Sequence, residues 1–203
     1  MAVYTKISKK DISYINRKFD IEKILEFKGI KQGIENTNYL LKSKSKKFIL
    51  TIFEKRVAKK ELPFFMNLMD KLNKSKINCP KPQIKKDGGY LINLKNKAAC
   101  IVSFLNGKDK KSLNFKNCYD IGKMIAEMHQ STKKINLTRK NSMGVRNLNP
   151  LLKSIKFKSK KFTNVEKFLK NNFKDIKTKW PENLPKGVIH GDLFIDNIFF
   201  KNN

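Results

Sequence analysis

The feature that most constrains this chain is a polar segment enclosed by two apolar runs near its C-terminus. The polar segment reads His-Gly-Asp at residues 190–192, followed by Asn197 after four intervening residues. The apolar runs on its two sides are residues 188–189 and 198–200. Short apolar runs of this kind are typical of buried strands, so the sequence predicts two short strands with a polar loop between them.

The spacing of this segment matches the catalytic loop of protein kinases, which is written H-R-D-x-x-x-x-N. In that loop the Asp accepts the proton of the acceptor hydroxyl, and the Asn holds Mg²⁺. Asp192 is therefore the candidate base, and Asn197 is the candidate metal ligand because its amide oxygen suits Mg²⁺. We expect His190 to brace the loop by hydrogen bonding rather than to act as a base. Asp196 is either a second metal ligand or, more simply, a residue that stabilises the turn.

The N-terminal half of the chain predicts an antiparallel sheet with two helices. The pattern of apolar residues gives the elements in this order: a helix at 11–19, strands at 24–30, 39–41 and 48–53, a helix at 59–73, and a hairpin of strands at 90–94 and 98–105. Pro63 is compatible with the second helix because it lies in the first turn. Three strands followed by a helix is the order in which the N-terminal lobe of a kinase begins.

The loop between the first two predicted strands is a candidate for nucleotide binding. It carries Gly29 and Gly33 ahead of Asn36 and Asn38. Backbone N–H groups in such a loop can cover the phosphates of a nucleotide, although a plain hairpin turn explains the same residues.

The end of the second hairpin is the other candidate, with Ser103 and Leu105 next to the turn residues 106–108. In a kinase this position is the hinge, where backbone groups bind the adenine edge. A buried strand that ends at a turn explains these residues equally well.

Two further helices are expected in the C-terminal half. The first spans residues 117–130 and should be capped by Asn117, and the second spans residues 164–180. Residues 130–150 are polar and predict irregular structure.

The formal net charge of +29 would by itself suggest a nucleic acid or an anionic membrane as partner. Only four of the 46 basic residues are arginines, whereas sites that bind phosphates or bases usually enrich arginine. The lysines are spread along the chain, and asparagine and isoleucine are abundant, as a genome rich in A and T would encode. We therefore do not expect a nucleic-acid partner.

The cysteines and the N-terminus indicate a cytoplasmic protein without a membrane anchor. Cys79, Cys100 and Cys118 are odd in number and widely spaced, which argues against a disulfide framework or a zinc site. The first residues contain no apolar signal region, and no apolar run reaches membrane-spanning length.

Taken together, the motifs of this chain resemble the homoserine kinases of the aminoglycoside phosphotransferase-like superfamily. The matching pieces, in the order of the family, are Met1-Ala-Val-Tyr-Thr5, Phe27-Lys-Gly-Ile-x-x-Gly-Ile-Glu-Asn-Thr-Asn38, Ile49-Leu-Thr-Ile-Phe-Glu-Lys-Arg-Val57, Glu61-Leu-Pro-Phe-Phe65, Cys79-Pro-x-Pro82, Met128-His129 and Trp180-Pro-x-x-Leu-Pro-x-Gly-Val-Ile-His-Gly-Asp-Leu-Phe-x-Asp-Asn197. They extend over nearly the whole chain.

The resemblance implies an α+β, protein kinase-like fold with two lobes. Residues 1–105 would form the nucleotide-binding N-lobe, with an antiparallel sheet and a helix. Residues 106–203 would form a partial helical C-lobe that ends just after the catalytic loop. The implied reaction transfers the γ-phosphoryl group of ATP, with Mg²⁺, to the side-chain hydroxyl of L-homoserine and so supplies O-phospho-L-homoserine for threonine biosynthesis.

Two departures from the family pattern affect these expectations. Where many relatives carry Lys or Arg in the third strand, this chain has Thr51, so Lys55 or Arg56 would have to reach the phosphates, and Glu61 would pair with one of them. The family also follows the catalytic loop with an Ile-Asp-Phe segment, whose Asp chelates Mg²⁺, and with a helical C-lobe. Neither follows Asn203, so we expect impaired kinase activity in this chain alone.

Alternative functions stay open at this point. Another amino alcohol, an aminoglycoside or choline could be the acceptor, because the residues present discriminate poorly among acceptors. A basic nucleic-acid-binding protein and a nucleotide-binding, non-catalytic pseudokinase are alternatives from other classes. The sequence does not indicate the oligomeric state.

Overall fold

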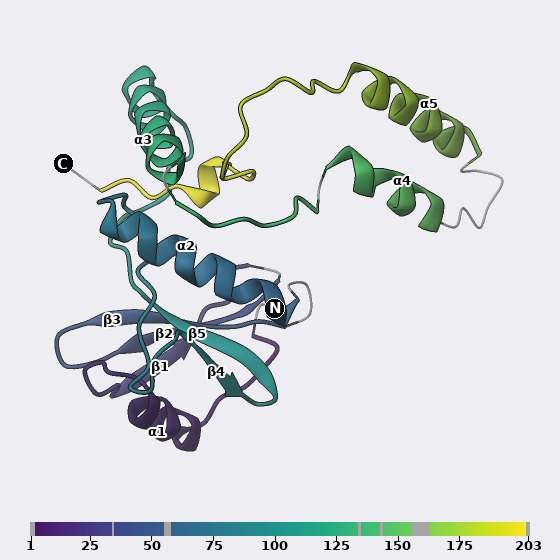
Figure 1. Ribbon diagram of the computed structural model, residues 1–203. Coiled ribbons are helices and arrows are strands. Elements are labelled where there is room, and N and C mark those ends of the chain that lie inside the picture. The colour runs from purple at the N-terminus through teal and green to yellow at the C-terminus, as the bar shows by residue number, and fades with distance from the viewer. Residues whose placement is uncertain are drawn as a thin grey trace. The chain divides into compact units, whose positions relative to one another are not determined.

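In the computed structural model, five antiparallel strands form one sheet in the order β1-β2-β3-β5-β4 (Figure 1). The strands are β1 (Glu26–Gly29), β2 (Thr37–Lys42), β3 (Lys47–Ile52), β4 (Leu91–Leu94) and β5 (Lys97–Ser103). All five predicted strands are confirmed, with β1 shorter and β2 longer than predicted.

The structure describes residues 3–33, 35–54, 58–133, 135–142, 144–155 and 163–201. The chain divides into two units: Met1–Leu137 with Gly187–Asn203, and Thr138–Lys186. The sheet, the helices α1 to α3 and the His-Gly-Asp loop belong to the first unit. The predicted division into lobes at residue 105 is a different partition and stays a prediction.

The turn between β4 and β5 confirms the predicted hairpin. Lys95 and Asn96 both have positive φ, of 54° and 61°. Two successive residues of this kind form the type I′ turn, whose twist matches that of the two strands it joins. Leu94 and Lys97 are consequently paired across the end of the hairpin.

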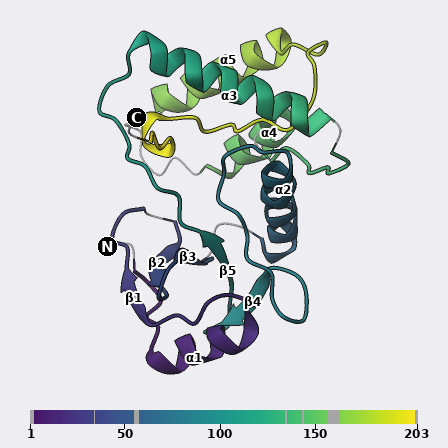
Figure 2. The ribbon, with the colours of Figure 1, turned by 90° about the vertical axis from the view of Figure 1, so that its left-hand side faces the viewer.

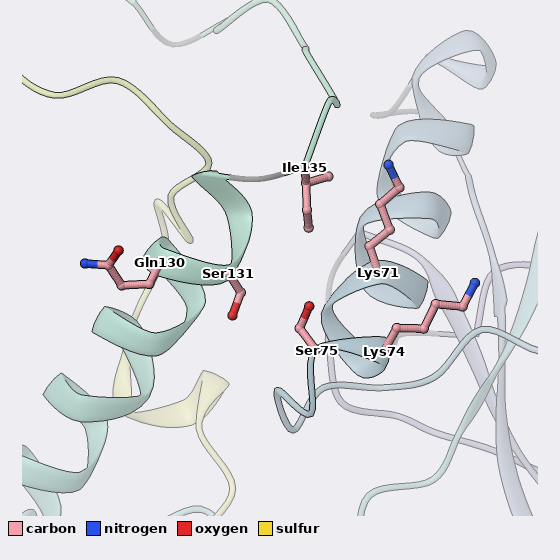
Figure 3. A pocket seen from close by; sticks show the side chains of 6 residues that line it. All are labelled: Lys71, Lys74, Ser75, Gln130, Ser131 and Ile135. Carbon is pink, nitrogen blue, oxygen red and sulfur yellow. The ribbon is translucent and has the colours of Figure 1, made fainter.

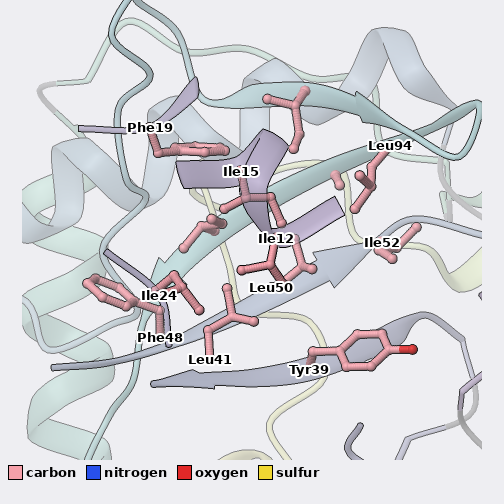
Figure 4. Packing of buried hydrophobic residues seen from close by; sticks show 13 residues of the cluster. Ile12, Ile15, Phe19, Ile24, Tyr39, Leu41, Phe48, Leu50, Ile52 and Leu94 are labelled. Atoms are coloured by element: carbon pink, nitrogen blue, oxygen red, sulfur yellow. The ribbon is translucent and has the colours of Figure 1, made fainter. Parts of the chain in front are cut away.

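Helix α1 (Lys9–Lys18) covers one face of the sheet. Its residues Ile12 and Ile15, with Phe19 just beyond it, are buried against the side chains of Leu41 and Leu50 (Figure 4). The predicted apolar face of this helix is therefore confirmed.

Helix α2 (Leu62–Lys74) covers the opposite face and follows the short 3-10 helix η1 (Lys59–Glu61) (Figure 1). Met66 of α2 packs against Cys100 and Val102 of β5, the residues that alternate with those facing α1. Strand β5 is thus buried on both faces, and β3 contributes side chains to both clusters. Pro63 lies in the first turn of α2, as expected.

The chain leaves β5, runs through residues 104–114 and enters helix α3 (Phe115–Lys133) (Figure 2). The predicted cap at Asn117 is wrong. Asn114 is the cap, because its side-chain oxygen accepts a hydrogen bond from the backbone N–H of Asn117 at 2.8 Å. Asn117 instead lies within the first turn, where its side-chain oxygen accepts the N–H of Asn114 at 3.4 Å. The two asparagines cap each other reciprocally, so the spacing alone assigned the cap to the wrong member of the pair.

The second unit contains α4 (Val145–Ser154) and α5 (Thr163–Lys179), which contact each other. Helix α5 confirms the prediction for residues 164–180. The expectation of irregular structure up to residue 150 is wrong, because α4 begins at Val145. Its apolar residues at 145, 148, 151 and 152 have helical spacing, and the helix forms despite Pro150 in its interior.

Within the described residues, no helix is both long enough and apolar enough to cross a membrane. The three cysteines are free, as expected. Burial raises the pKa of the Cys79 thiol to about 11 and that of Cys100 to about 12, so both are protonated at neutral pH.

The two-sided burial of the central strands predicts that their side chains determine stability. Replacing the fully buried Leu50 by alanine should lower the free energy of unfolding by about 2–5 kcal/mol, because it leaves a cavity between α1 and the sheet. Chemical denaturation monitored by circular dichroism measures this.

Leu25→Ala is the matched control, because Leu25 is 61% exposed and its loss should change the free energy of unfolding by less than about 0.5 kcal/mol. Equal effects of the two substitutions would contradict the assigned core.

Candidate active site

The His-Gly-Asp segment forms a loop held by its own hydrogen bonds. The short 3-10 helix η3 (Ile195–Asn197) closes it, and the backbone N–H of Asn197 donates to the carbonyl of Phe194 at 3.0 Å. Gly191 has a φ of 75°, a left-handed conformation that L side chains rarely adopt. Glycine is therefore the suitable residue between the His and the Asp in this loop.

The predicted site residues of this loop are brought together. The side-chain amide of Asn197 donates to the backbone carbonyl of Asp192 at 2.9 Å and to its carboxylate at 3.2 Å. The backbone N–H of Asp192 donates to Nδ1 of His190 at 3.4 Å. All three residues are exposed. His190 thus accepts a bond within the loop, in agreement with a bracing function, and the Asp192 carboxylate is open to solvent.

The two predicted flanking strands do not form. Residues 187–190 have no regular secondary structure, and Ile189 is 67% exposed. Among the described residues after the loop, Phe200 alone is in a β-bridge, opposite Lys108. Residues 187–190 have no neighbouring strand to pair with among the described residues.

The Lys108–Phe200 bridge holds the end of the loop beside the segment that follows β5. The N–H of Lys108 donates to the carbonyl of Phe200 at 3.0 Å, and the N–H of Phe200 donates back at 2.9 Å. The ammonium group of Lys110 lies 4.8 Å from the centre of the Phe200 ring, a cation–π contact. A Cβ atom at Gly107 would be 3.0 Å from Cβ of Phe199, so glycine permits this close approach.

The predicted phosphate loop connects β1 and β2. Gly33 has a φ of 91°, and the N–H of Ile30 donates to the carbonyl of Asn38 at 2.9 Å. A Cβ atom at Gly29 would lie 2.9 Å from Val3, which explains the first glycine as a close-contact position. The backbone conformation therefore explains glycine at position 33, and close packing explains glycine at position 29.

The asparagines of this loop bond to β3 and to the residues after it. The hydroxyl of Thr51 donates to the side-chain oxygen of Asn38 at 2.8 Å. The backbone N–H of Glu54 donates to the side-chain oxygen of Asn36 at 3.4 Å. Thr51 thus orients Asn38 from the neighbouring strand. Lys55 lies outside the described residues, and Glu61 ends η1 immediately before α2.

The two predicted hinge residues differ in their hydrogen bonding. Ser103 bonds to Lys81 twice, because its N–H donates to the Lys81 carbonyl and its hydroxyl accepts the Lys81 N–H. Within the described chain, the backbone of the half-buried Leu105 makes no hydrogen bond to protein. The backbone groups of Leu105 are therefore available to a ligand, whereas the N–H of Ser103 is already bonded to Lys81.

Two hollows in the first unit lie at other positions. One, of about 650 Å³, is lined by Lys71, Lys74, Ser75, Gln130, Ser131 and Ile135, and contains no predicted site residue (Figure 3). The other, of about 570 Å³, includes Ser103 beside Phe48 and Phe104. Neither of these two hollows is lined by a residue of the His-Gly-Asp loop.

Comparison with known proteins shows the family of this chain. Residues 26–203 match the family model described as the phosphotransferase enzyme family. The chain belongs to this family. Its resemblance to homoserine kinases is also confirmed: it is 36% identical to the homoserine kinase of Rhizobium etli and 38% identical to that of Paramagnetospirillum magneticum, each over 98% of this chain. The chain spans 63% and 62% of the lengths of these two relatives.

Solved structures of phosphotransferases share the fold. A spectinomycin phosphotransferase in complex with ADP and spectinomycin matches 98% of this chain and 67% of its own length, with a TM-score of 0.65 and 15% identity. A microcompartment-associated aminopropanol kinase matches 71% of this chain and 48% of its own length, with a TM-score of 0.55 and 13% identity. The predicted α+β, kinase-like fold of this chain is therefore confirmed.

The geometry of the Lys108–Phe200 bridge makes a prediction for Gly107. In Gly107→Ala, the new methyl group should push Phe199 and Phe200 away and weaken the bridge. Overpacking of this kind costs about 1–3 kcal/mol, so exchange of the Phe200 amide hydrogen should become about tenfold faster or more. Hydrogen–deuterium exchange measures this directly.

Gly122→Ala is the control, because nothing lies within 4 Å of its added Cβ atom and alanine favours the helix α3 in which it lies. The exchange of Phe200 should be unchanged in this variant. Unaltered exchange in both variants would show that the bridge does not depend on Gly107.

Proposed function

We propose that the His-Gly-Asp site transfers the γ-phosphoryl group of ATP to the side-chain hydroxyl of L-homoserine, as a step of threonine biosynthesis in the cytoplasm. The observation that carries this proposal is the 36–38% identity with homoserine kinases over 98% of the chain. The kinase-like fold and the geometry of the loop support phosphoryl transfer, and the three unpaired cysteines fit a reducing compartment.

Asp192 is the proposed base. Its exposed carboxylate would accept a hydrogen bond from the homoserine hydroxyl and so orient the oxygen towards phosphorus. As the new O–P bond forms, the bond between the γ-phosphorus and the oxygen bridging to ADP breaks, and the hydroxyl proton passes to Asp192. His190 and Asn197 hold this residue in place through the bonds described above.

Mg²⁺ would be held together with the nucleotide. The described residues contain no cluster of three His, Cys, Asp or Glu side chains that could bind a metal ion alone. Asn197 offers one amide oxygen, and its amide nitrogen donates to the carboxylate of Asp192, which is the proposed base. Nucleotide phosphates and water would supply the other ligands of Mg²⁺. Bound there, the ion would neutralise charge on the transferred phosphoryl group.

The nucleotide itself would lie against the sheet. Gly29, Gly33, Asn36 and Asn38 would surround the phosphates, and the free backbone of Leu105 would meet the adenine edge. Ser103 would belong to this edge through its carbonyl. Lys55 would bind the phosphates, and Glu61 would pair with Lys55. The ADP bound to the spectinomycin phosphotransferase of similar fold supports nucleotide binding here.

The choice of acceptor can be tested directly. We expect the chain to release ADP from ATP and Mg²⁺ faster with L-homoserine than with 1-amino-2-propanol, choline or spectinomycin. A fusion in which the unmatched part of the Rhizobium etli homoserine kinase follows residue 203 should be assayed in parallel, because that relative is longer. A coupled assay for ADP gives the rates.

Preference of both proteins for another acceptor would refute homoserine as the substrate. ATP binding without turnover in both would instead favour a non-catalytic nucleotide-binding protein.

The function of Asp192 is a separate prediction. Asp192→Asn should lower kcat by about 100- to 10,000-fold, because general base catalysis contributes about that much. The substitution is made in the 203-residue chain or in the fusion, whichever phosphorylates the acceptor. Asp120→Asn, which removes an exposed carboxylate of α3 paired with Lys116, should leave kcat unchanged. Equal rates of the Asp192 variant and the unaltered protein would exclude Asp192 as the base.

A further inference from the structure

A polar network lies at the end of β3, centred on the carboxylate of Glu54. One oxygen of this carboxylate accepts hydrogen bonds from the hydroxyls of Thr5 and Thr37, at 2.7 and 2.6 Å. The other oxygen is paired with the ammonium group of Lys97, which also donates to the hydroxyl of Thr5 at 2.7 Å. The Glu54 side chain is only 10% exposed.

The network joins four segments that are distant in the sequence. Thr5 belongs to the N-terminal segment, Thr37 begins β2, Glu54 follows β3, and Lys97 begins β5. The hydroxyl of Tyr39 points away from the apolar cluster (Figure 4) and donates to the carbonyl of Thr5 at 2.9 Å. The hydroxyl of the fully buried Thr37 also accepts the backbone N–H of Thr5 at 3.1 Å.

The charge of Glu54 is compensated within the network. Burial alone would raise the pKa of its carboxyl group, but hydrogen bonds from Lys97, Thr37 and Thr5 outweigh this and hold the pKa below its ordinary value of 4.5. The folded state therefore gains stability from this group at pH values above 4.5, and this gain is lost as the pH falls through the lowered pKa. At neutral pH the carboxylate is charged, so all three donors have an acceptor.

Glu54 is also bonded to the C-terminal end of the loop proposed to bind phosphates. Thr37 lies between Asn36 and Asn38 in the sequence, and its side chain donates to the Glu54 carboxylate. Asn36 accepts the backbone N–H of the same residue, Glu54. The C-terminal end of the loop is thus held to the end of β3 by two hydrogen bonds. One joins the side chains of Thr37 and Glu54, and the other joins the backbone N–H of Glu54 to the side chain of Asn36.

We propose that Glu54 is a positioning residue for the nucleotide. It holds Asn36 and Asn38 in register with β3, so that the loop between β1 and β2 is preorganised before the phosphates bind. This inference rests on the proposed function. It assigns to Glu54 an indirect action through Thr37 and the loop, without contact to the substrate.

A matched ion pair elsewhere separates positioning from plain stabilisation. Asp11, at the start of α1, is 13% exposed and is paired with Lys95 of the β4–β5 turn at 3.3 Å. It accepts the backbone N–H of Ser8 at 2.8 Å, so it too joins the N-terminal region to this hairpin. Among its described partners there is no residue of the β1–β2 loop. Asp11→Asn therefore removes a comparable carboxylate without touching the loop.

The test compares binding of ADP and the thermal unfolding midpoint in the 203-residue chain and its variants. Glu54→Gln leaves Lys97 and both threonine hydroxyls without a full set of acceptors, and Thr37→Val removes one donor while the ion pair with Lys97 remains. We expect Glu54→Gln to weaken ADP binding about tenfold or more, because a loop that is not preorganised must be ordered when the nucleotide binds, and about 1.4 kcal/mol of that cost is tenfold in affinity. Thr37→Val should weaken it less. Asp11→Asn should lower the unfolding midpoint but leave ADP affinity unchanged.

Each outcome decides the inference. Weaker ADP binding in the Glu54 and Thr37 variants, with normal binding in the Asp11 variant, supports positioning. If the unaltered chain binds ADP and all variants bind it equally, Glu54 is only structural and this inference alone fails. If the unaltered chain binds no ADP, the proposed nucleotide site is refuted for this chain and the inference fails with it. Thr37→Val keeps the test decisive should Glu54→Gln not fold.

Discussion

Burial of the central strands on both faces is the constraint on which the rest of the first unit depends. Leu50 and Ile101 face α1, while Cys100 and Val102 face α2. Each face of such a strand needs its own apolar cover, and here α1 covers one face and α2 the other. This arrangement leaves the strand ends and their connections for polar chemistry. The loop between β1 and β2 and the segment after β5 are both of this kind.

At the end of β3 the apolar core gives way to polar groups. A carboxylate in such a position costs free energy unless donors surround it, and Glu54 has three of them. Removing one partner of such a set leaves the others unsatisfied, so the network favours a single arrangement of four chain segments. Because a change in this arrangement would leave hydrogen-bonding groups unsatisfied, the network is suited to hold a binding loop in place.

The His-Gly-Asp loop depends on a different kind of support. Its residues are bonded mainly to one another, and the Lys108–Phe200 bridge holds its end against the segment after β5. Because that segment includes Leu105 and Gly107, one short stretch of backbone lies next to both the proposed adenine edge and the catalytic loop. A shift of this stretch would therefore affect both.

Much of the local structure was predictable because its causes are local. The apolar spacing of α1 and α2, the turn at Lys95 and Asn96, and the spacing of Asp192 and Asn197 are all properties of a few consecutive residues. The same holds for the family motifs. The sequence by itself thus determined the five strands of the sheet, the helices α1, α2, α3 and α5, and their order.

Tertiary structure decided which partners these elements meet. Residues 188–189 have the composition of a strand, but a strand needs a neighbour with which to share hydrogen bonds, and the described structure provides none there. The Glu54 network joins residues as far apart as Thr5 and Lys97, 92 positions in the sequence, and no local pattern marks such a set. The sequence determined what each segment can form, and folding decided which polar groups came within hydrogen-bond distance, because those distances depend on how the whole sheet packs.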